Sequence, residues 1–321
     1  MTNTITLIIT VLNEGDGLRP LLDSLTAQTL LPHEIVVTDG GSTDNTVDIL
    51  QEYQTSLPIR IIHTSGANIS EGRNRAIEAA SGDIIVATDA GVVLAPVWVE
   101  AITQPIRHNN VQVVSGWFEP DPYTDFEVVM GATVLPSRAD IDPDKFLPSS
   151  RSVAFYKSAW QAVGGYPEWL DFSEDLIFDL NLREQYGTFP FAPKAIAYFR
   201  PRSNMRAYAK QYYLYARGDG KADLWRKRHA IRYVVYLLGL PVLLLPIARN
   251  QLLGWILLAL GGVAYCFRPF ARLHEATIGW QPFARAWAFG LVPVIRFVGD
   301  VAKMLGYPVG VLWRLRHRNM L

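Results

Sequence analysis

The sequence predicts an α/β fold, a mostly parallel mixed sheet with helices on both faces, followed by apolar C-terminal helices. Short β-branched runs, such as 5–10 and 34–38, alternate with segments of helical spacing along the first hundred residues, which is typical of such a sheet. Residues 226–321 are apolar and carry 13 Lys and Arg against 2 Asp and Glu. We therefore expect two domains, 1–225 and 226–321.

The expected elements follow in order along the first domain. The strands are short and apolar, as in sheets that are buried on both faces. Four leucines at helical spacing follow the first strand, with Asp16 as the expected N-cap and Pro20 in the first turn. Further strands are expected at 60–63, 83–88 and 153–156, and further helices after Ser42, at 73–80 and at 176–186. Residues 116–150 are rich in Pro, Asp and Gly, which predicts a loop-dominated region.

The tail contains two apolar runs, 233–247 and 251–267. At 1.5 Å per residue they reach about 22–25 Å, short of the roughly 30 Å hydrocarbon core of a bilayer. A tilted hairpin, re-entrant helices and interfacial helices all remain open, and so does a buried helix pair in a soluble protein. A third stretch, 286–313, carries charges and is expected either in the interface or packed on the other two segments. Basic clusters flank the tail, so two crossings would leave both clusters in the cytoplasm.

Composition narrows the class of protein. The formal net charge is zero, but residues 1–225 carry 17 Lys and Arg against 28 Asp and Glu. In the tail, Leu, Trp and Val interleave with the arginines, a pattern that favours anionic lipid as partner over nucleic acid. The single Cys266 excludes an internal disulfide and agrees with a reducing compartment. The N-terminus has no signal-peptide pattern, so the N-terminal body is expected in the cytoplasm.

Acidic residues lie where ligands bind in sheets of this kind. Asp39 and Asp89 end predicted strands, and ligands bind beyond the carboxyl ends of parallel strands. An acid at such a position is placed to hold a metal or a ribose. The later pair Glu174-Asp175 precedes an apolar helical run and is placed to take a proton. Together these acids suggest a sugar transferase.

Five motifs, spread over about residues 4–225, resemble in order and spacing those of family 2 glycosyltransferases with a GT-A (Rossmann-like) fold. They are Thr10–Glu14, Asp39–Asp44, Gly72–Ala76, Asp89–Gly91 and Glu174–Asp175. The resemblance implies an inverting enzyme that moves a sugar from a nucleotide-diphosphate donor, assisted by a divalent cation, Mg²⁺ or Mn²⁺. The tail resembles membrane segments of many bacterial members.

The resemblance assigns the nucleoside to the ends of the first two strands. Val11, Asn13 and Glu14 follow the first strand, where family members contact the nucleoside. Asp39 would accept the imide N–H of uracil or a comparable base edge. Two alternatives remain: the Asp39 motif is only a turn in which Ser42 caps a helix, and Glu14 only caps a helix.

The diphosphate and a metal ion are assigned next. Arg73 opens a helix and would bond a pyrophosphate oxygen. The alternative is that Arg73 lies on a solvated helix face, where Arg75 is expected. Asp89 resembles the first acid of the family's Asp-x-Asp metal motif, with Gly91 as a departure at the third position. A metal there would have to use the diphosphate, water or another residue as well.

Proton transfer is assigned to the acidic pair. Asp175 is the expected general base, with Glu174 beside it as a like charge that raises its basicity. The alternative is that these acids only stabilise a helix N-terminus. Residues 211–218 resemble a degraded Gln-x-x-Arg-Trp motif of processive synthases, which favours transfer of a single sugar; Arg217 is expected to face the diphosphate. Trp117 either stacks on a sugar or is a buried aromatic.

The sequence thus predicts a membrane-associated glycosyltransferase at the cytoplasmic (inner) membrane, with its catalytic domain facing the cytoplasm. The expected partners are a nucleotide-diphosphate sugar, a lipid-linked or growing polysaccharide acceptor and membrane lipid, and no nucleic acid. One alternative has polyprenyl phosphate as acceptor, as in dolichyl-phosphate mannose synthases. Others are a non-catalytic nucleotide-binding membrane scaffold and a nucleotidyltransferase.

Overall fold

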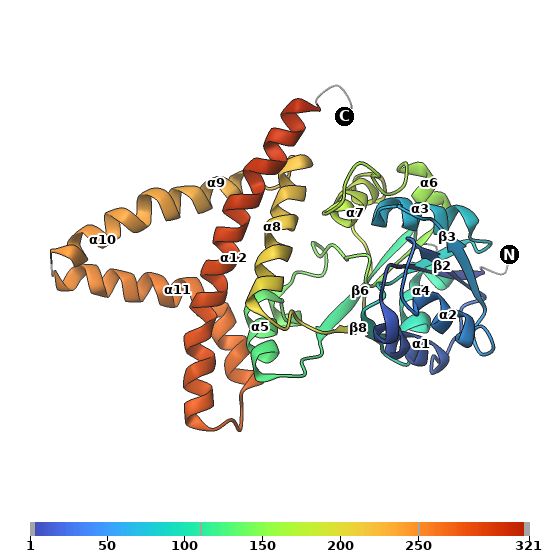
Figure 1. The fold of residues 1–321 in the computed structure, drawn as a ribbon, viewed down its shortest axis with the longest axis horizontal. Coiled ribbons are helices and arrows are strands. Elements are labelled where there is room, and N and C mark those ends of the chain that lie inside the picture. The colour runs from blue at the N-terminus through green and yellow to red at the C-terminus, as the bar shows by residue number, and fades with distance from the viewer. Residues whose placement is uncertain (1–3, 110, 250, 318–321) are drawn as a thin grey trace. The chain divides into compact units, whose positions relative to one another are not determined.

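The computed structural model describes residues 4–109, 111–249 and 251–317 (Figure 1). Its contacts divide the chain into two compact units. The first consists of 1–121 and 140–200, and the second consists of 122–139 and 201–321. The residues just before 225 thus belong with the tail, and the expected domain boundary at 225 stays a prediction.

The first unit is built on a mixed sheet, which confirms the predicted fold class. The strand order is β3-β2-β1-β4-β7-β6-β8-β5. The pairs β1–β2, β2–β3, β1–β4 and β6–β8 are parallel, whereas β7 and β5 pair antiparallel to their neighbours. The strands are β1 (Ile5–Val11), β2 (Glu34–Asp39), β3 (Ile59–His63), β4 (Ile84–Ala87), β5 (Val92–Leu94), β6 (Val113–Pro120), β7 (Val153–Tyr156) and β8 (Phe191–Phe199).

Helices cover both faces of this sheet. Alternate residues of β1 explain why, since Leu7 joins one buried cluster and Ile8 the other. Leu21 and Trp98 cover the first face, and Phe178 covers the second. The helices of this unit are η1 (Gly15–Leu18), α1 (Arg19–Thr26), α2 (Thr46–Tyr53), α3 (Ile69–Ala79), α4 (Trp98–Asn109), α6 (Lys157–Ala162) and α7 (Glu174–Tyr186).

Two local predictions were wrong. Asp16 lies inside η1 and does not cap a helix. The helix expected at 73–80 begins earlier because Asn68 and Glu71 form a capping box, with Asn68 Oδ1 accepting from the Glu71 backbone N–H. The polar capping residues carry no apolar periodicity, so the spacing of apolar residues alone missed that first turn.

The region 116–150 is also more regular than predicted. It contains the end of β6, the helix α5 (Asp125–Val134) and the short turn η2 (Arg138–Asp140). Thr124 caps α5 by accepting from the Glu127 backbone N–H at 3.3 Å. Most of α5 is apolar on all sides, which hides the helical period in the sequence.

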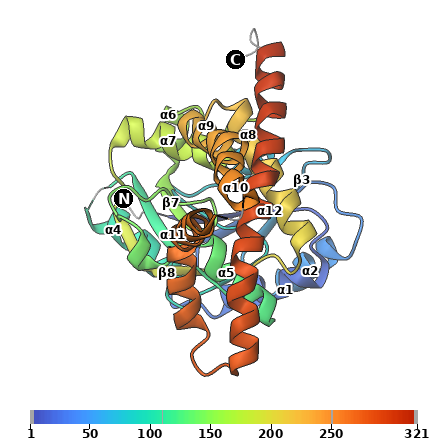
Figure 2. The same ribbon diagram turned by 90° about the vertical axis from the view of Figure 1, so that its left-hand side faces the viewer.

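The second unit is helical. Its core joins Met130 of α5, Tyr208 of α8, Cys266 and Leu273 of α11, and Val292 of α12. In Figure 2 the helix α10 and the first part of α11 are seen nearly end-on. Besides α5, the helices are α8 (Met205–Lys221), α9 (Arg226–Val234), the π-helical η3 (Val235–Gly239), α10 (Leu240–Ala248), α11 (Leu252–Ala276) and α12 (Pro282–Arg316).

Glycines bring α8 and α12 into backbone contact. A Cβ atom at Gly306 would clash with the carbonyl oxygen of Tyr213, and one at Gly310 with that of Arg217. Small residues of this kind let two helix backbones approach closely, as they do between membrane helices. The pair therefore packs without intervening side chains at these two positions.

Two segments of the second unit are long and apolar enough to cross a membrane. They are 226–246, with 21 residues, and 252–276, with 25 residues. Helical continuity across 226–246 gives a length of about 31 Å, so the lengths expected from the apolar runs alone were too short. Only 6% and 17% of their most apolar windows are buried, which disfavours the alternative of a buried helix pair in a soluble protein.

Candidate active site

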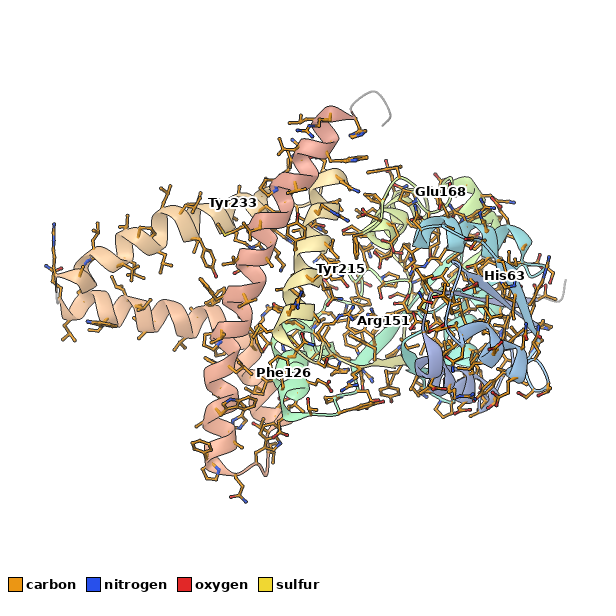
Figure 3. The ribbon with its side chains drawn as sticks, viewed as in Figure 1. His63, Phe126, Arg151, Glu168, Tyr215 and Tyr233 are labelled. Atoms are coloured by element: carbon orange, nitrogen blue, oxygen red, sulfur yellow. The ribbon has the colours of Figure 1, made fainter. Side chains whose placement is uncertain are left out.

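The carboxyl ends of three neighbouring strands meet at one edge of the sheet. In the parallel register Val11 of β1 pairs with Asp39 of β2, and Asp39 pairs with His63 of β3. The backbone N–H of Gly40 donates to the Val11 carbonyl at 2.9 Å. The strand ends that were expected to bind a ligand therefore lie side by side. His63 (labelled in Figure 3) lies at the same edge, although no histidine was assigned a role.

Asp39 is held as a buried anion at this edge. Its side chain is 3% exposed. Oδ1 accepts from the backbone N–H of Ser42 at 3.0 Å, and Oδ2 lies 3.3 Å from Nδ1 of His63. Burial works to raise the pKa of Asp39, but the bonds with Ser42 and His63 outweigh it, and the pKa lies below its usual value. A charged carboxylate that can accept a base N–H is thus in place.

The loop after β1 is fixed to the loop after β2. Asn13 adopts a left-handed backbone conformation with φ of 55°, which asparagine tolerates better than most residues. Its backbone N–H donates to the Ser42 hydroxyl at 2.9 Å, and its Oδ1 accepts from the Thr43 N–H at 2.8 Å. Ser42 is therefore engaged with Asn13, and α2 begins only at Thr46. The alternative that Ser42 caps this helix does not fit.

Glu14 lies within electrostatic range of the other acids. Burial raises the pKa of Glu14, and the charges of Asp89 and Asp44 raise it further. Glu14 makes no side-chain capping bond to η1, so the capping alternative for this residue also fails. The structure thus brings the β1 loop near the end of β4, although the contact of Glu14 with a nucleoside stays a prediction.

Arg73 joins two of the predicted acids. Its side chain is 5% exposed, its Nη1 lies 2.7 Å from Glu174 Oε1, and its Nη2 lies 3.0 Å from Asp89 Oδ1. Burial opposes the charge of the guanidinium, but the charges of Glu174 and Asp89 prevail and raise the pKa of Arg73. The alternative of a solvated helix face is therefore wrong for Arg73, whereas Arg75 is exposed as expected.

The acidic pair opens α7. Glu174 is buried, and burial together with the charge of Asp175 raises the pKa of Glu174 to about 7. Asp175 is half-buried, and its Oδ1 accepts from the Leu176 backbone N–H at 2.8 Å. One turn later Asp179 is fully buried, and burial and then Asp175 raise the pKa of Asp179. Asp179 lies four residues after Asp175, a spacing that places both on the same face of a helix, and this spacing could have indicated Asp179 in the sequence.

A second arginine, which the sequence analysis missed, faces Asp89. Arg151 Nε lies 3.4 Å from Asp89 Oδ2, and the Arg151 side chain is 20% exposed. Arg151 lies two residues before the start of β7, and β7 pairs antiparallel to β4. Antiparallel pairing carries the start of β7 to the carboxyl end of β4, which no motif in the sequence indicates.

A divalent cation does not fit this set of donors. One oxygen of Asp89 faces Arg73 and the other faces Arg151. Gly91 offers no carboxylate, and within the described ranges no three His, Cys, Asp or Glu side chains form a group that could hold a metal. Mg²⁺ and Mn²⁺ prefer several oxygen ligands. The geometry gives no support to Asp89 as a metal ligand, which stays a prediction.

Two aromatic and basic candidates lie elsewhere. Trp117 is 1% exposed and stacks on Phe118 with ring centroids 5.0 Å apart, so the buried alternative fits it. Arg217 lies in α8 of the second unit. Its expected contact with the diphosphate stays a prediction.

The chain is similar to known glycosyltransferases. Residues 6–156 match the family model described as glycosyl transferase family 2. An uncharacterized glycosyltransferase, YibD of Escherichia coli, is 37% identical over 113 residues, which cover 35% of this chain and 33% of that protein. The succinoglycan biosynthesis protein ExoA of Rhizobium meliloti is 25% identical and covers 79% of each chain. The alignments span only about a third of the length of the first curated relatives.

Solved structures give the same fold. A mannosyltransferase from Pyrobaculum calidifontis, in complex with GDP-mannose and Mn²⁺, superimposes with a TM-score of 0.58 at 19% identity, covering 96% of this chain and 87% of that one. TarS 1–349 of S. aureus, in complex with UDP-GlcNAc, has a TM-score of 0.51 at 16% identity, covering 98% and 92%. Residues 6–156 thus resemble glycosyl transferase family 2, and the fold is GT-A.

Proposed function

We propose that this protein is an inverting glycosyltransferase that moves one sugar from a nucleoside diphosphate sugar to a lipid-linked or growing polysaccharide acceptor. The observation that carries the proposal is the ion-paired row Glu174–Arg73–Asp89 at the carboxyl edge of the sheet. Arg73 ties the start of α7, which carries the expected base, to the end of β4. The donor and the base are thereby assigned to one site.

In the proposed donor complex, Asp39 accepts the N–H of the base and the loop of Asn13 and Glu14 borders the nucleoside. Arg73 supplies a fixed positive charge for the diphosphate, since its charge is maintained by two carboxylates. When the bond between sugar C1 and the diphosphate oxygen breaks, negative charge develops on that oxygen. A preorganised cation stabilises this charge without reorganisation.

Asp175 is the proposed general base. An acceptor hydroxyl attacks C1 from the face opposite the diphosphate, its proton passes to Asp175, and the configuration at C1 inverts. The carboxylate of the neighbouring Glu174 accepts a hydrogen bond from Arg73. Among the hydrogen bonds of the described residues, the carboxylate of Asp175 has none with that arginine. This supports Asp175 over Glu174 as the proton acceptor.

The acceptor class and the location rest on the second unit. Two segments are long and apolar enough to cross a membrane, and ExoA is a relative named for the biosynthesis of succinoglycan, a polysaccharide. These observations support a lipid-linked or polysaccharide acceptor at the cytoplasmic face of the inner membrane. The positive residues 226–228 at the start of the first segment favour that side.

The test is nucleoside diphosphate release by the detergent-purified protein with a panel of nucleotide sugars and a membrane lipid extract as acceptor source. Each donor is assayed with EDTA and with Mn²⁺, because the mannosyltransferase structure contains Mn²⁺. We expect release from one donor, and we expect Asp175→Asn to lower the rate about 10²–10⁴-fold, the usual contribution of a general base. The exposed Asp48→Asn in α2 is the control.

The outcomes separate the parts of the proposal. Full activity of Asp175→Asn contradicts its role as base, and retention of configuration in the product, read by NMR, contradicts inversion. Release of pyrophosphate from a nucleoside triphosphate and a sugar 1-phosphate, in a parallel assay, identifies a nucleotidyltransferase. An acid-labile product identifies a sugar phosphodiester and hence a polyprenyl phosphate acceptor. No release from any donor refutes the enzymatic proposal and favours a scaffold.

A further inference from the structure

Arg151 is held firmly beside Asp89 by contacts on three sides. The Thr88 hydroxyl, next to Asp89 in the chain, donates to the Arg151 carbonyl at 2.9 Å. The guanidinium carbon lies 4.1 Å from the ring centroid of Phe199 and 5.8 Å from that of Phe118. A guanidinium over an aromatic face is stabilised by the ring and loses little freedom when it binds an anion. Figure 3 labels Arg151 among the side chains of the first unit.

The two arginines leave Asp89 as an anion between two cations. Arg73 lies 3.0 Å from one carboxylate oxygen and Arg151 lies 3.4 Å from the other. For a metal ion to bind Asp89, at least one guanidinium would have to move away, and Gly91 supplies no second carboxylate. The carboxylate thus has the geometry of a shared counter-ion for two arginines.

Accessibility distinguishes the two arginines. The Arg73 side chain is 5% exposed and also bound to Glu174, whereas the Arg151 side chain is 20% exposed. Asp89 itself is 30% exposed, so an anion from solvent can approach the Arg151 side of this pair. Arginine binds phosphate oxygens through parallel N–H donors, and it does so without the several oxygen ligands that a divalent ion needs.

We propose that Arg151 binds the diphosphate of the donor directly, while Asp89 acts as the counter-ion that positions Arg73 and Arg151. This inference rests on the proposed function, since it assigns the diphosphate of the nucleotide sugar to this edge of the sheet. In the family pattern, a metal ion bound by two acids neutralises the charge of the diphosphate; in this proposal, arginine neutralises it. Binding of the diphosphate then occurs without a divalent cation.

The test is isothermal titration of the full-length protein in detergent with pyrophosphate, UDP and GDP, in EDTA and in Mn²⁺. We expect pyrophosphate and one of the nucleotides to bind in EDTA. Arg151→Ala is expected to weaken both at least about tenfold, as for the loss of a charge-assisted hydrogen bond, and Arg151→Lys is expected to restore part of the loss. Arg60→Ala, an exposed arginine of β3, is expected to change neither.

Asp89→Asn gives the decisive comparison, because the two roles predict opposite changes. A counter-ion competes with phosphate for the arginines, so its removal is expected to strengthen pyrophosphate binding in EDTA a few-fold. A metal ligand, when removed, abolishes binding that depends on Mn²⁺. If Arg151→Ala fails to fold by thermal unfolding, Arg151→Lys and Asp89→Asn decide between the two roles.

Failure of the inference and failure of the proposed function give different results. One result overturns the role of Arg151 and leaves the glycosyltransferase proposal standing. In that result, binding of the nucleotide requires Mn²⁺, is lost in Asp89→Asn and is unchanged in Arg151→Lys. If neither nucleotide nor pyrophosphate binds the folded wild-type protein in EDTA or Mn²⁺, both proposals fall.

Discussion

Replacement of Arg73 by methionine tests whether the acids of the site depend on this arginine. Arg73 and Glu174 have side chains that are 5% and 9% exposed, so methionine would leave the Glu174 carboxylate without its cation in a buried position. Breaking a buried ion pair in this way costs about 3–5 kcal/mol. For a unit of this size the corresponding drop in Tm is roughly 6–20 °C. Arg75→Met, on the exposed side of the same helix, is the control and is expected to stay within about 0.5 kcal/mol.

The double variant Arg73→Met/Glu174→Gln isolates the pair itself. Glutamine removes the orphaned charge, so we expect the double variant to recover part of the lost stability, with a coupling energy of about 1–3 kcal/mol. Thermal unfolding in detergent measures the Tm, and hydrogen exchange of peptides from α3 and α7 assigns the transition to the first unit. Strictly additive losses, or an Arg73→Met variant as stable as Arg75→Met, would refute the coupling.

Three further predictions concern the same structure. The pKa of Glu174 in the folded state is about 7, above its ordinary value, so the folded state keeps this proton at a pH where the unfolded state has lost it. Stability is therefore expected to fall as the pH rises from about 4.5 to 7. The variant Glu174→Gln is expected to flatten this dependence of the Tm on pH. Gly310→Ala is expected to cost about 1–3 kcal/mol by overpacking α8 against α12, whereas Gly290→Ala, with open space around it, is expected to be neutral or slightly stabilising in the same thermal assay. Gly165 has a φ of 75°, and a Cβ atom there would lie 2.8 Å from Trp160 Nε1, so Gly165→Ala is expected to lower the Tm. Gly17 has open space around it, so Gly17→Ala is expected to leave the Tm unchanged. Equal Tm values of the two variants would contradict the expected strain at Gly165.

The sequence predicted the parts of the structure that depend on local pattern. Apolar runs located β1, β2 and β4, and acids at the ends of β2 and β4 indicated the ligand edge, because strand ends are visible in a single sequence. The resemblance to the family singled out Arg73, whose pairing with Glu174 joins residues 101 positions apart. That pairing depends on the packing of α3 against the start of α7, and no spacing rule predicts it.

The residues that were missed became neighbours through strand pairing. His63 meets Asp39 through the parallel register of β2 and β3, and Arg151 meets Asp89 because β7 runs antiparallel to β4. Neither residue lies in a motif, and register is set by the packing of the whole sheet. The helix α5 was missed for a different reason, since its apolar residues surround the helix and give no periodic signal.

The backbone contact between α8 and α12 also limits how the second unit can move. Because Gly306 and Gly310 leave no side chain between the helices at these positions, neither helix can slide or rotate against the other without a clash of backbone atoms. A tilt of α12 must therefore be followed by α8. The segment 211–218, which resembles the synthase motif, lies on α8, so its orientation follows that of α12.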